Sequence, residues 1–193
     1  MKISAKKSTL FSFLIIFGYF SAVIGTNLFF DPWQLFHKPW FRDATFINKP
    51  RLQNAGIINN YQFDSIILGT SMAQNFSANE ASKLWGSKFV NLSMGAGWFI
   101  ERDLVLNYTL RKQSLNNVIM SVDFSLNDAG AYNPRRPVGQ YDFLYNDSRF
   151  DDLKLYVKPL IHCWSLSSSC ATELPGARIQ EQDELYRWIT NRP

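Results

Sequence analysis

The chain has 193 residues, of which 46% are hydrophobic and 19% charged, and its formal net charge is +4 at pH 7. Residues 1–30 contain three lysines and no acid, so residues 31–193 hold 17 basic and 16 acidic side chains. This near-neutral balance excludes the basic surface that nucleic-acid-binding proteins present, and we expect no nucleic acid among the partners. The length after residue 30 suits one domain of ordinary size.

A membrane-spanning helix is the first predicted element. Leu10–Phe30 contains no charged residue over 21 positions, and about 20 apolar residues are enough to cross the hydrocarbon core of a bilayer. Lys2, Lys6 and Lys7 precede this stretch, and Asp31 follows it. Because basic residues stay on the cytoplasmic side, we expect a single-pass anchor in a lipid bilayer, with the N-terminus inside and the rest of the chain outside.

Two other interpretations of the same stretch stay open. A cleaved signal peptide has an apolar core of about 7–15 residues, shorter than this one, although the small residues at 21–23 and 25–27 are compatible with cleavage. A helix of a globular domain usually shows a polar face, and none interrupts this run. The aromatic residues that follow predict an interfacial belt at the membrane rather than a sugar-stacking surface: Trp33, Phe36, Trp40 and Phe41.

The segment after the anchor is predicted to be a connector. Proline lacks the backbone N–H and clashes with the preceding helical turn, so Pro32, Pro39 and Pro50 interrupt any long helix here. We therefore divide the chain into a cytoplasmic tip with the anchor (1–30), a juxtamembrane connector (31–60) and one domain (61–193).

Short apolar runs predict three buried strands: Asp64–Gly69, Lys88–Leu92 and Asn117–Val122. Helices are predicted between them, one after Ser77, which has capping-box spacing to Glu80, and one over Phe99–Lys112. This alternation of strands and helices indicates an α/β fold with a parallel sheet. Such sheets place ligand sites beyond the carboxyl ends of their strands.

The rest of the chain gives fewer signals. Residues 129–150 are rich in Tyr, Asn, Asp, Pro and Arg and predict a long functional loop or an insertion. Within it, Arg135 and Arg136 are either a solvated pair or contacts for an anionic substrate. Further helices are predicted from Asp152 and over residues 181–189.

Two cysteines, Cys163 and Cys170, lie close together in the sequence. In an oxidising compartment they would close a short disulfide loop, and two unrelated thiols are the alternative. Only His37 and His162 are available to supplement them, so we predict no metal site and no cofactor.

The loop after each predicted strand carries a candidate group for acyl transfer. Ser71 follows the first strand and stands near the start of a helix, whose dipole and N–H groups favour it as a nucleophile; the alternative is that it only caps that helix. Gly95 and Gly97 follow the second strand, either as turn residues or as backbone donors of an oxyanion hole. Asn127, after the third strand, is either a turn residue or a further amide donor.

These segments resemble the first three sequence blocks of the SGNH (GDSL-like) hydrolase superfamily. The resemblance is carried by the strand-Gly-x-Ser turn, by Asn-x-Ser-x-Gly-x-Gly at 91–97 and by VDFSLND at 122–128. They are more similar to its membrane-anchored bacterial branch, which includes cell-envelope polysaccharide O-acetyltransferases and lipoteichoic-acid D-alanylation proteins. The resemblance covers residues 60–128 and implies a flavodoxin-like three-layer domain, incomplete in this chain.

The resemblance also implies catalytic roles. Ser71 would be the nucleophile, while Gly95 or Gly97, together with Asn127, would donate hydrogen bonds to the oxyanion. It implies a membrane-anchored esterase or acyltransferase of the bacterial inner membrane that acts on an extracytoplasmic cell-envelope glycan. The expected partners are an envelope polysaccharide and a membrane acyl-transfer partner.

Two departures from the family pattern leave a second interpretation open. Thr70 stands where the classical pattern has Asp, and the Asp-x-x-His block that supplies the general base is absent, since Pro159 precedes His162 by three residues. A serine without a base is a weak nucleophile. The alternative is therefore an inactive anchored scaffold or glycan-binding protein, or a gene fragment that keeps the fold without the base.

Overall fold

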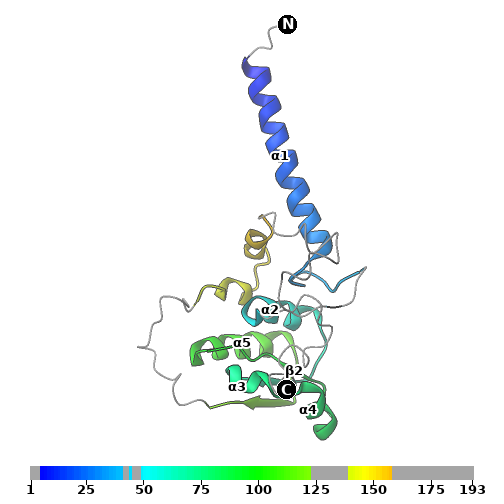
Figure 1. Cartoon of the computed structure of the whole chain (residues 1–193), viewed down its shortest axis with the longest axis vertical. Helices are drawn as coiled ribbons and strands as arrows, with labels where there is room; N and C mark the ends of the chain where they lie inside the picture. The colour runs from blue at the N-terminus through cyan, green and yellow to red at the C-terminus, as the bar shows by residue number, and fades with distance from the viewer. Residues whose placement is uncertain (1–4, 41–43, 45–48, 123–138, 158–193) are drawn as a thin grey trace, which may run out of the picture.

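The computed structural model describes residues 5–40, 44, 49–122 and 139–157. Within these ranges the chain is a mixed α/β protein, in which a long N-terminal helix leads into a body built on a three-stranded parallel sheet (Figure 1). The prediction of an α/β fold with parallel strands is confirmed.

Helix α1, Ala5–Phe30, is the expected apolar helix. Its segment Lys7–Phe30 is long and apolar enough to cross a membrane, and only 6% of its most apolar window is buried. Figure 1 shows the helix standing clear of the body. Phe11, for example, is 66% exposed, so the described part of the chain does not cover the apolar surface of α1.

The last turn of α1 belongs to the packed body. Asn27 is 3% exposed, and its side-chain amide donates to the Tyr156 carbonyl oxygen. Asp31 is fully buried and accepts hydrogen bonds from the Tyr156 hydroxyl and from the backbone N–H groups of residues 35–37, the latter at 2.7–3.0 Å. A buried carboxylate requires such donors, so these contacts fix how the chain leaves the helix.

The aromatic residues predicted as a membrane belt divide into two groups. Phe36 packs edge to face on Tyr156, with ring centroids 5.2 Å apart, and Trp33 lies against the main hydrophobic core. Trp40 is 62% exposed and stacks on the His37 ring at 4.0 Å. Packing against the body therefore explains Phe36 and Trp33, whereas Trp40 remains largely exposed.

Helix α2, Pro50–Asn60, was not predicted from the sequence and lies in the range assigned to the connector. Pro50 occupies its first turn, where a helix needs no N–H from that residue. The proline interpreted as a breaker therefore starts a helix. Leu52 and Ile58 are buried in the main core, so part of the range 31–60 is packed into the body.

The sheet contains β1 (Ser65–Leu68), β2 (Phe89–Asn91) and β3 (Asn117–Met120) in the order β2-β1-β3. All pairings are parallel: Ser65 pairs with Phe89 on one side and with Asn117 on the other. The central strand β1 is buried along its whole length, as its continuous apolar run predicts. Each strand lies inside its predicted range.

Helices cover both faces of the sheet. Ile66 and Leu68 join the core formed with α2 and α5 (Phe99–Lys112), whereas Ile67 faces a smaller cluster with α4 (Ala78–Trp85). This division arises because successive strand residues point to opposite faces. Figure 1 shows α2 and α5 on the side of the sheet toward α1 and α4 on the other side.

The helix boundaries follow local signals. Helix α5 has the predicted bounds, and α4 begins directly after Ser77, whose hydroxyl accepts from the Glu80 N–H at 3.0 Å. An additional single turn, α3 (Ser71–Gln74), precedes α4. The sequence predicts the cap of α4 correctly but does not separate α3 from it.

Two short 3-10 helices, η2 (Asp142–Tyr145) and η3 (Asp151–Leu155), close the described body. Leu144 and Tyr145 are 1% and 5% exposed and belong to the main core. This part of the predicted functional loop 129–150 therefore packs the domain. Other predicted features lie outside the described residues: Phe41, Asn127, Arg135, Arg136, His162, Cys163, Cys170 and the helix over 181–189.

Candidate functional site

Close packing around Gly69 builds the first loop. A Cβ on Gly69 would lie 2.2 Å from the Ser121 hydroxyl oxygen and 2.6 Å from the Ala73 Cβ, distances that no side chain can occupy. Ser121 follows β3, and its N–H donates to the Leu68 carbonyl oxygen at 3.0 Å. The residue after β1 must be glycine for the ends of β1 and β3 to meet α3.

Ser71 is the first residue of α3 and is half-buried. Thr70 caps this helix, because its hydroxyl accepts from the Met72 N–H at 3.4 Å. The interpretation that Ser71 only caps the helix is therefore wrong. Since α3 has four residues, the helix dipole expected at Ser71 is small, and the position of Ser71 at the end of the central strand is its distinguishing feature.

The second loop, which follows β2, is hydrogen-bonded to the first. The Met94 N–H donates to the Gly69 carbonyl oxygen at 2.9 Å. The Asn91 side chain donates to the Ala73 carbonyl oxygen at 2.9 Å and accepts from the Ser93 N–H at 3.0 Å. Asn91 is 2% exposed, so these bonds form away from water and hold the two loops in register.

The two candidate glycines take different parts in a tight turn. The Gly97 N–H donates to the Met94 carbonyl oxygen at 2.8 Å and closes the turn. Ala96 has a φ of +50°, which is the sign required at the second central residue of a type II turn. A Cβ on Gly95 would lie 3.8 Å from the Gln74 side-chain oxygen. Gly95 thus faces the first loop, while the N–H of Gly97 is used inside the turn.

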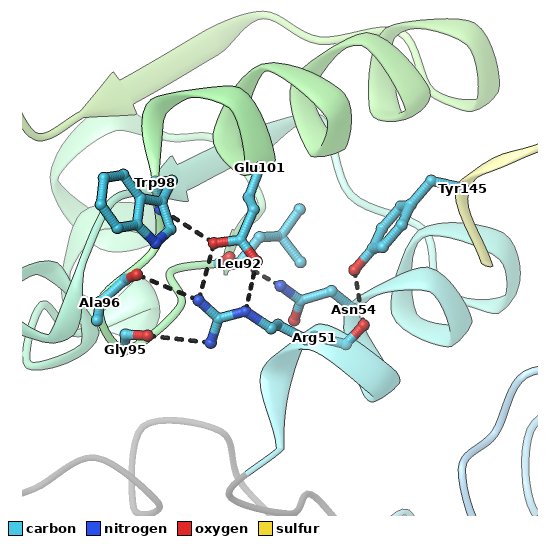
Figure 2. Close-up of polar contacts among 8 residues, drawn as sticks. All are labelled: Arg51, Asn54, Leu92, Gly95, Ala96, Trp98, Glu101 and Tyr145. Carbon is cyan, nitrogen blue, oxygen red and sulfur yellow. Dashed lines mark hydrogen bonds and ion pairs between the residues drawn. The ribbon is translucent and has the colours of Figure 1, made fainter. Parts of the chain in front are cut away.

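An ion pair between Arg51 of α2 and Glu101 of α5 holds this turn in place (Figure 2). The Arg51 guanidinium binds both carboxylate oxygens of Glu101, at 2.6 and 2.9 Å. It also donates to the carbonyl oxygens of Gly95 and Ala96, at 3.0 and 3.2 Å. Glu101 in turn accepts from the Trp98 N–H at 3.0 Å. Arg51 therefore has four acceptors that span the loop and the start of α5.

Burial and charge shift the pKa values of the groups around this pair. The hydrogen bond to Glu101 raises the pKa of Arg51. Burial raises the pKa of Tyr145, whose hydroxyl donates to the Arg51 carbonyl oxygen at 3.0 Å. Burial, with the charge of Glu101, also raises the pKa of Asp142, which lines a small pocket beside the pair together with Tyr141. Arg51 stays charged and Tyr145 stays a donor at neutral pH.

The third strand end is described as far as Val122, so the predicted donor Asn127 lies beyond it. Arg102 of α5 is 1% exposed, and its guanidinium donates to the Ser121 carbonyl oxygen. The helix that carries Glu101 therefore also holds the end of β3. All three strand ends are linked to one another through α3 and α5.

The structure describes His37, one of the two histidines in the sequence. Its ring nitrogens lie 2.8 Å from the Leu28 carbonyl oxygen and 2.7 Å from that of Lys38. His37 thus holds the chain at the end of α1. Within the described ranges, no three His, Cys, Asp or Glu side chains come together in a way that could hold a metal ion.

No family model, no curated protein and no solved structure matches this chain. Function is therefore inferred from the residues and their geometry.

Sequence reasoning missed Arg51 and Glu101. Glu101 stands three residues after Trp98, the position from which an acidic side chain reaches back to the start of a helix, so its backbone contact could have been predicted. Arg51 has no comparable signal, because its partner lies 50 residues away along the chain.

Proposed function

We propose that this chain is a membrane-anchored SGNH-like esterase or acyltransferase that acts on an acyl group of an extracytoplasmic cell-envelope glycan. The observation that carries the proposal is the position of Ser71, half-buried just beyond the carboxyl end of the central strand, in a short helix α3 whose last residue, Gln74, lies beside Gly95 of the second loop. A nucleophile and a backbone donor from neighbouring strand ends are what acyl transfer requires.

The proposed reaction uses this arrangement directly. The Ser71 hydroxyl oxygen attacks the acyl carbonyl carbon, and the N–H groups of Ser71 and Gly95, with the Asn127 amide, stabilise the oxyanion. The ester C–O bond then breaks, and the Ser71 proton leaves with the departing alcohol. Water or a glycan hydroxyl takes the acyl group from Ser71 and restores the serine. Gly97 has no role as donor because its N–H binds Met94.

The proposal includes a flavodoxin-like fold. In that fold the first three strands have the order 2-1-3 and are parallel, as β2-β1-β3 are here. Helices on both faces of the sheet agree with this arrangement.

The proposal also includes α1 as an uncleaved anchor in the bacterial inner membrane, with the N-terminus inside. Residues 8–26 of a helix extend about 28 Å, close to the thickness of a bilayer core. Beyond them, Asn27 and Asp31 are buried against Tyr156. Cleavage within 21–27 would cut a helix that is packed into the body, and this favours the anchor over a signal peptide.

A second candidate, from another class, is a catalytically inactive anchored scaffold or glycan-binding protein. It is favoured by the structural role of His37 at the end of α1. An envelope polysaccharide is the proposed partner in either case, and a membrane acyl-transfer partner belongs to the enzyme only.

A serine-directed fluorophosphonate probe separates the two candidates. The full-length chain, purified in detergent, should gain one probe adduct that maps to Ser71, and Ser71→Ala should gain none. Ser77→Ala is the matched control, since Ser77 caps α4 and its loss should leave the labelling intact. An unlabelled, folded wild type would favour the inactive scaffold.

Orientation has a separate test. A reporter that is active only outside the cytoplasm, fused after Pro193, should be active. A stable but silent fusion would contradict the proposed topology.

A further inference from the structure

We infer that Arg51 and Glu101 are positioning residues for the donor loop, a role that rests on the proposed acyl-transfer function. Neither side chain is assigned to contact the substrate. They would act through the turn Met94–Gly97. Their bonds set the direction of the Ala96 N–H and hold the turn closed, and the closed turn keeps the Gly95 N–H pointing outward.

Peptide geometry explains how the pair would do this. In a planar trans peptide the C=O and N–H groups point in opposite directions. The Met94 carbonyl oxygen is held inside the turn by the Gly97 N–H, so the N–H of Gly95 points out of it. The Gly95 carbonyl oxygen is held by Arg51 at 3.0 Å, so the N–H of Ala96 points away from Arg51.

The turn needs support because of its sequence. A type II turn favours glycine at its second central position, where φ is positive, and this chain has Ala96 with a φ of +50°. A non-glycine residue in that region carries strain of about 1 kcal/mol or more. The bond from Arg51 to the Ala96 carbonyl oxygen, at 3.2 Å, stabilises the strained conformation.

Glu101 orients the guanidinium that supplies these bonds. The bidentate contact at 2.6 and 2.9 Å fixes the plane of the Arg51 side chain, as such planar pairs do. The Glu101 carboxylate is anchored by the Trp98 N–H, and the backbone of Arg51 is anchored by the Tyr145 hydroxyl. Figure 2 shows the guanidinium enclosed by the carboxylate and the two carbonyls.

The variant Arg51→Lys distinguishes the effect of the positive charge from the effect of the guanidinium geometry. Arg51→Lys keeps the charge beside Glu101 but cannot donate to both carbonyls and both carboxylate oxygens at once. We expect Arg51→Lys to remain folded and its rate of fluorophosphonate labelling at Ser71 to fall about tenfold, less than the loss from deleting an oxyanion donor. Glu101→Gln should lower the rate in the same direction and serves as the second variant if Arg51→Lys does not fold.

Two further readouts distinguish positioning from general stabilisation. The ratio of labelling rates for P=O and P=S forms of the same probe reports on hydrogen bonding to the oxyanion, and we expect this ratio to be lower in Arg51→Lys than in the wild type. Adding Ala96→Gly should restore much of the rate, because glycine adopts a positive φ without support. Lys112→Met, which breaks an exposed ion pair of α5 with Asp147, should match the wild type in rate and ratio.

The possible failures are distinguishable. A wild type that is folded and unlabelled overturns the proposed function and this inference with it. A labelled wild type with folded Arg51→Lys and Glu101→Gln variants of equal rate and ratio overturns the inference alone.

Discussion

The side-chain amide of Asn91 donates a hydrogen bond of 2.9 Å to the carbonyl oxygen of Ala73, and this bond joins the end of β2 to the helix α3 that follows β1. The same amide donates to the Phe76 carbonyl oxygen at 2.9 Å. The segment that carries Ser71 is therefore held in place by the last residue of β2, which directly precedes the loop that carries Gly95.

Asn91→Asp tests this connection. The change preserves shape but replaces a donor by a carboxylate that faces two carbonyl oxygens in a site 2% exposed. We expect the free energy of unfolding to fall by about 3 kcal/mol, at the upper end for a lost buried hydrogen bond because the replacement is charged. Chemical denaturation of the full chain measures this loss. Stability equal to the wild type would show that Asn91 does not tie the loops.

Gly69→Ala is expected to destabilise the chain by about 1–3 kcal/mol. The new Cβ would lie 2.2 Å from the Ser121 hydroxyl oxygen. Gly95→Ala is the matched control, since its Cβ would meet nothing closer than 3.8 Å, and we expect it to fold normally. Both are measured by thermal unfolding.

A second substitution tests the same contact between Gly69 and Ser121. Ser121→Gly removes the hydroxyl that Gly69→Ala would meet, so the double variant should recover part of the lost stability. The contact with Ala73, at 2.6 Å, limits the recovery. Strict additivity of the two single changes would contradict the close contact.

Tyr156→Phe is expected to loosen the joint between α1 and the body. Burial raises the pKa of Tyr156, so its hydroxyl stays a donor to the buried Asp31 carboxylate. Loss of that bond should cost about 1–3 kcal/mol and speed proteolysis just after α1. Tyr141→Phe is the control, because it deletes the hydroxyl of a half-buried tyrosine directly before η2. It should change neither the free energy of unfolding nor the rate of proteolysis. Equal protease resistance in Tyr156→Phe would argue against a fixed joint.

The raised pKa of Asp152 predicts that the stability of the chain depends on pH. Burial raises its pKa to about 6, and its Oδ1 atom has no hydrogen-bond partner among the described residues. An acid whose pKa rises on folding favours the folded state when protonated, so this contribution is present below about pH 4 and is lost as the pH rises through about 6.

Asp152→Asn removes that titration. We expect the variant to be more stable than the wild type at pH 7 by about 1 kcal/mol, after allowance for solvent screening, and the difference to vanish near pH 4. Unfolding measured across this range checks the sign. A difference in the free energy of unfolding between variant and wild type that grows toward low pH would contradict the raised pKa of Asp152.

The strands and the helix α5 could be predicted from sequence because their signals are local. The apolar run at β1 and the capping residue Ser77 act within a few neighbouring residues. α2 could not, because Pro50 is compatible both with a break and with the first turn of a helix. What decides between them is the burial of Leu52 and Ile58 against distant strands.

The candidate site likewise contains residues that local sequence signals indicate and residues that only distant contacts reveal. Ser71, Gly95 and Gly97 were found because each follows a strand, but the choice between the glycines depends on a hydrogen bond of Gly97 to Met94 that no pattern indicates. Arg51 was missed because it reaches the loop from another helix. The roles of these residues stay predictions, and so does that of Asn127.

A membrane-impermeant fluorophosphonate, applied to intact spheroplasts that express the full chain, tests whether Ser71 is reactive and lies outside the cytoplasm. We expect the wild type to be labelled without lysis and Ser71→Ala to remain unlabelled at equal expression. Labelling only after lysis would contradict the orientation. No labelling of the folded wild type before or after lysis would contradict the assignment of Ser71 as a nucleophile.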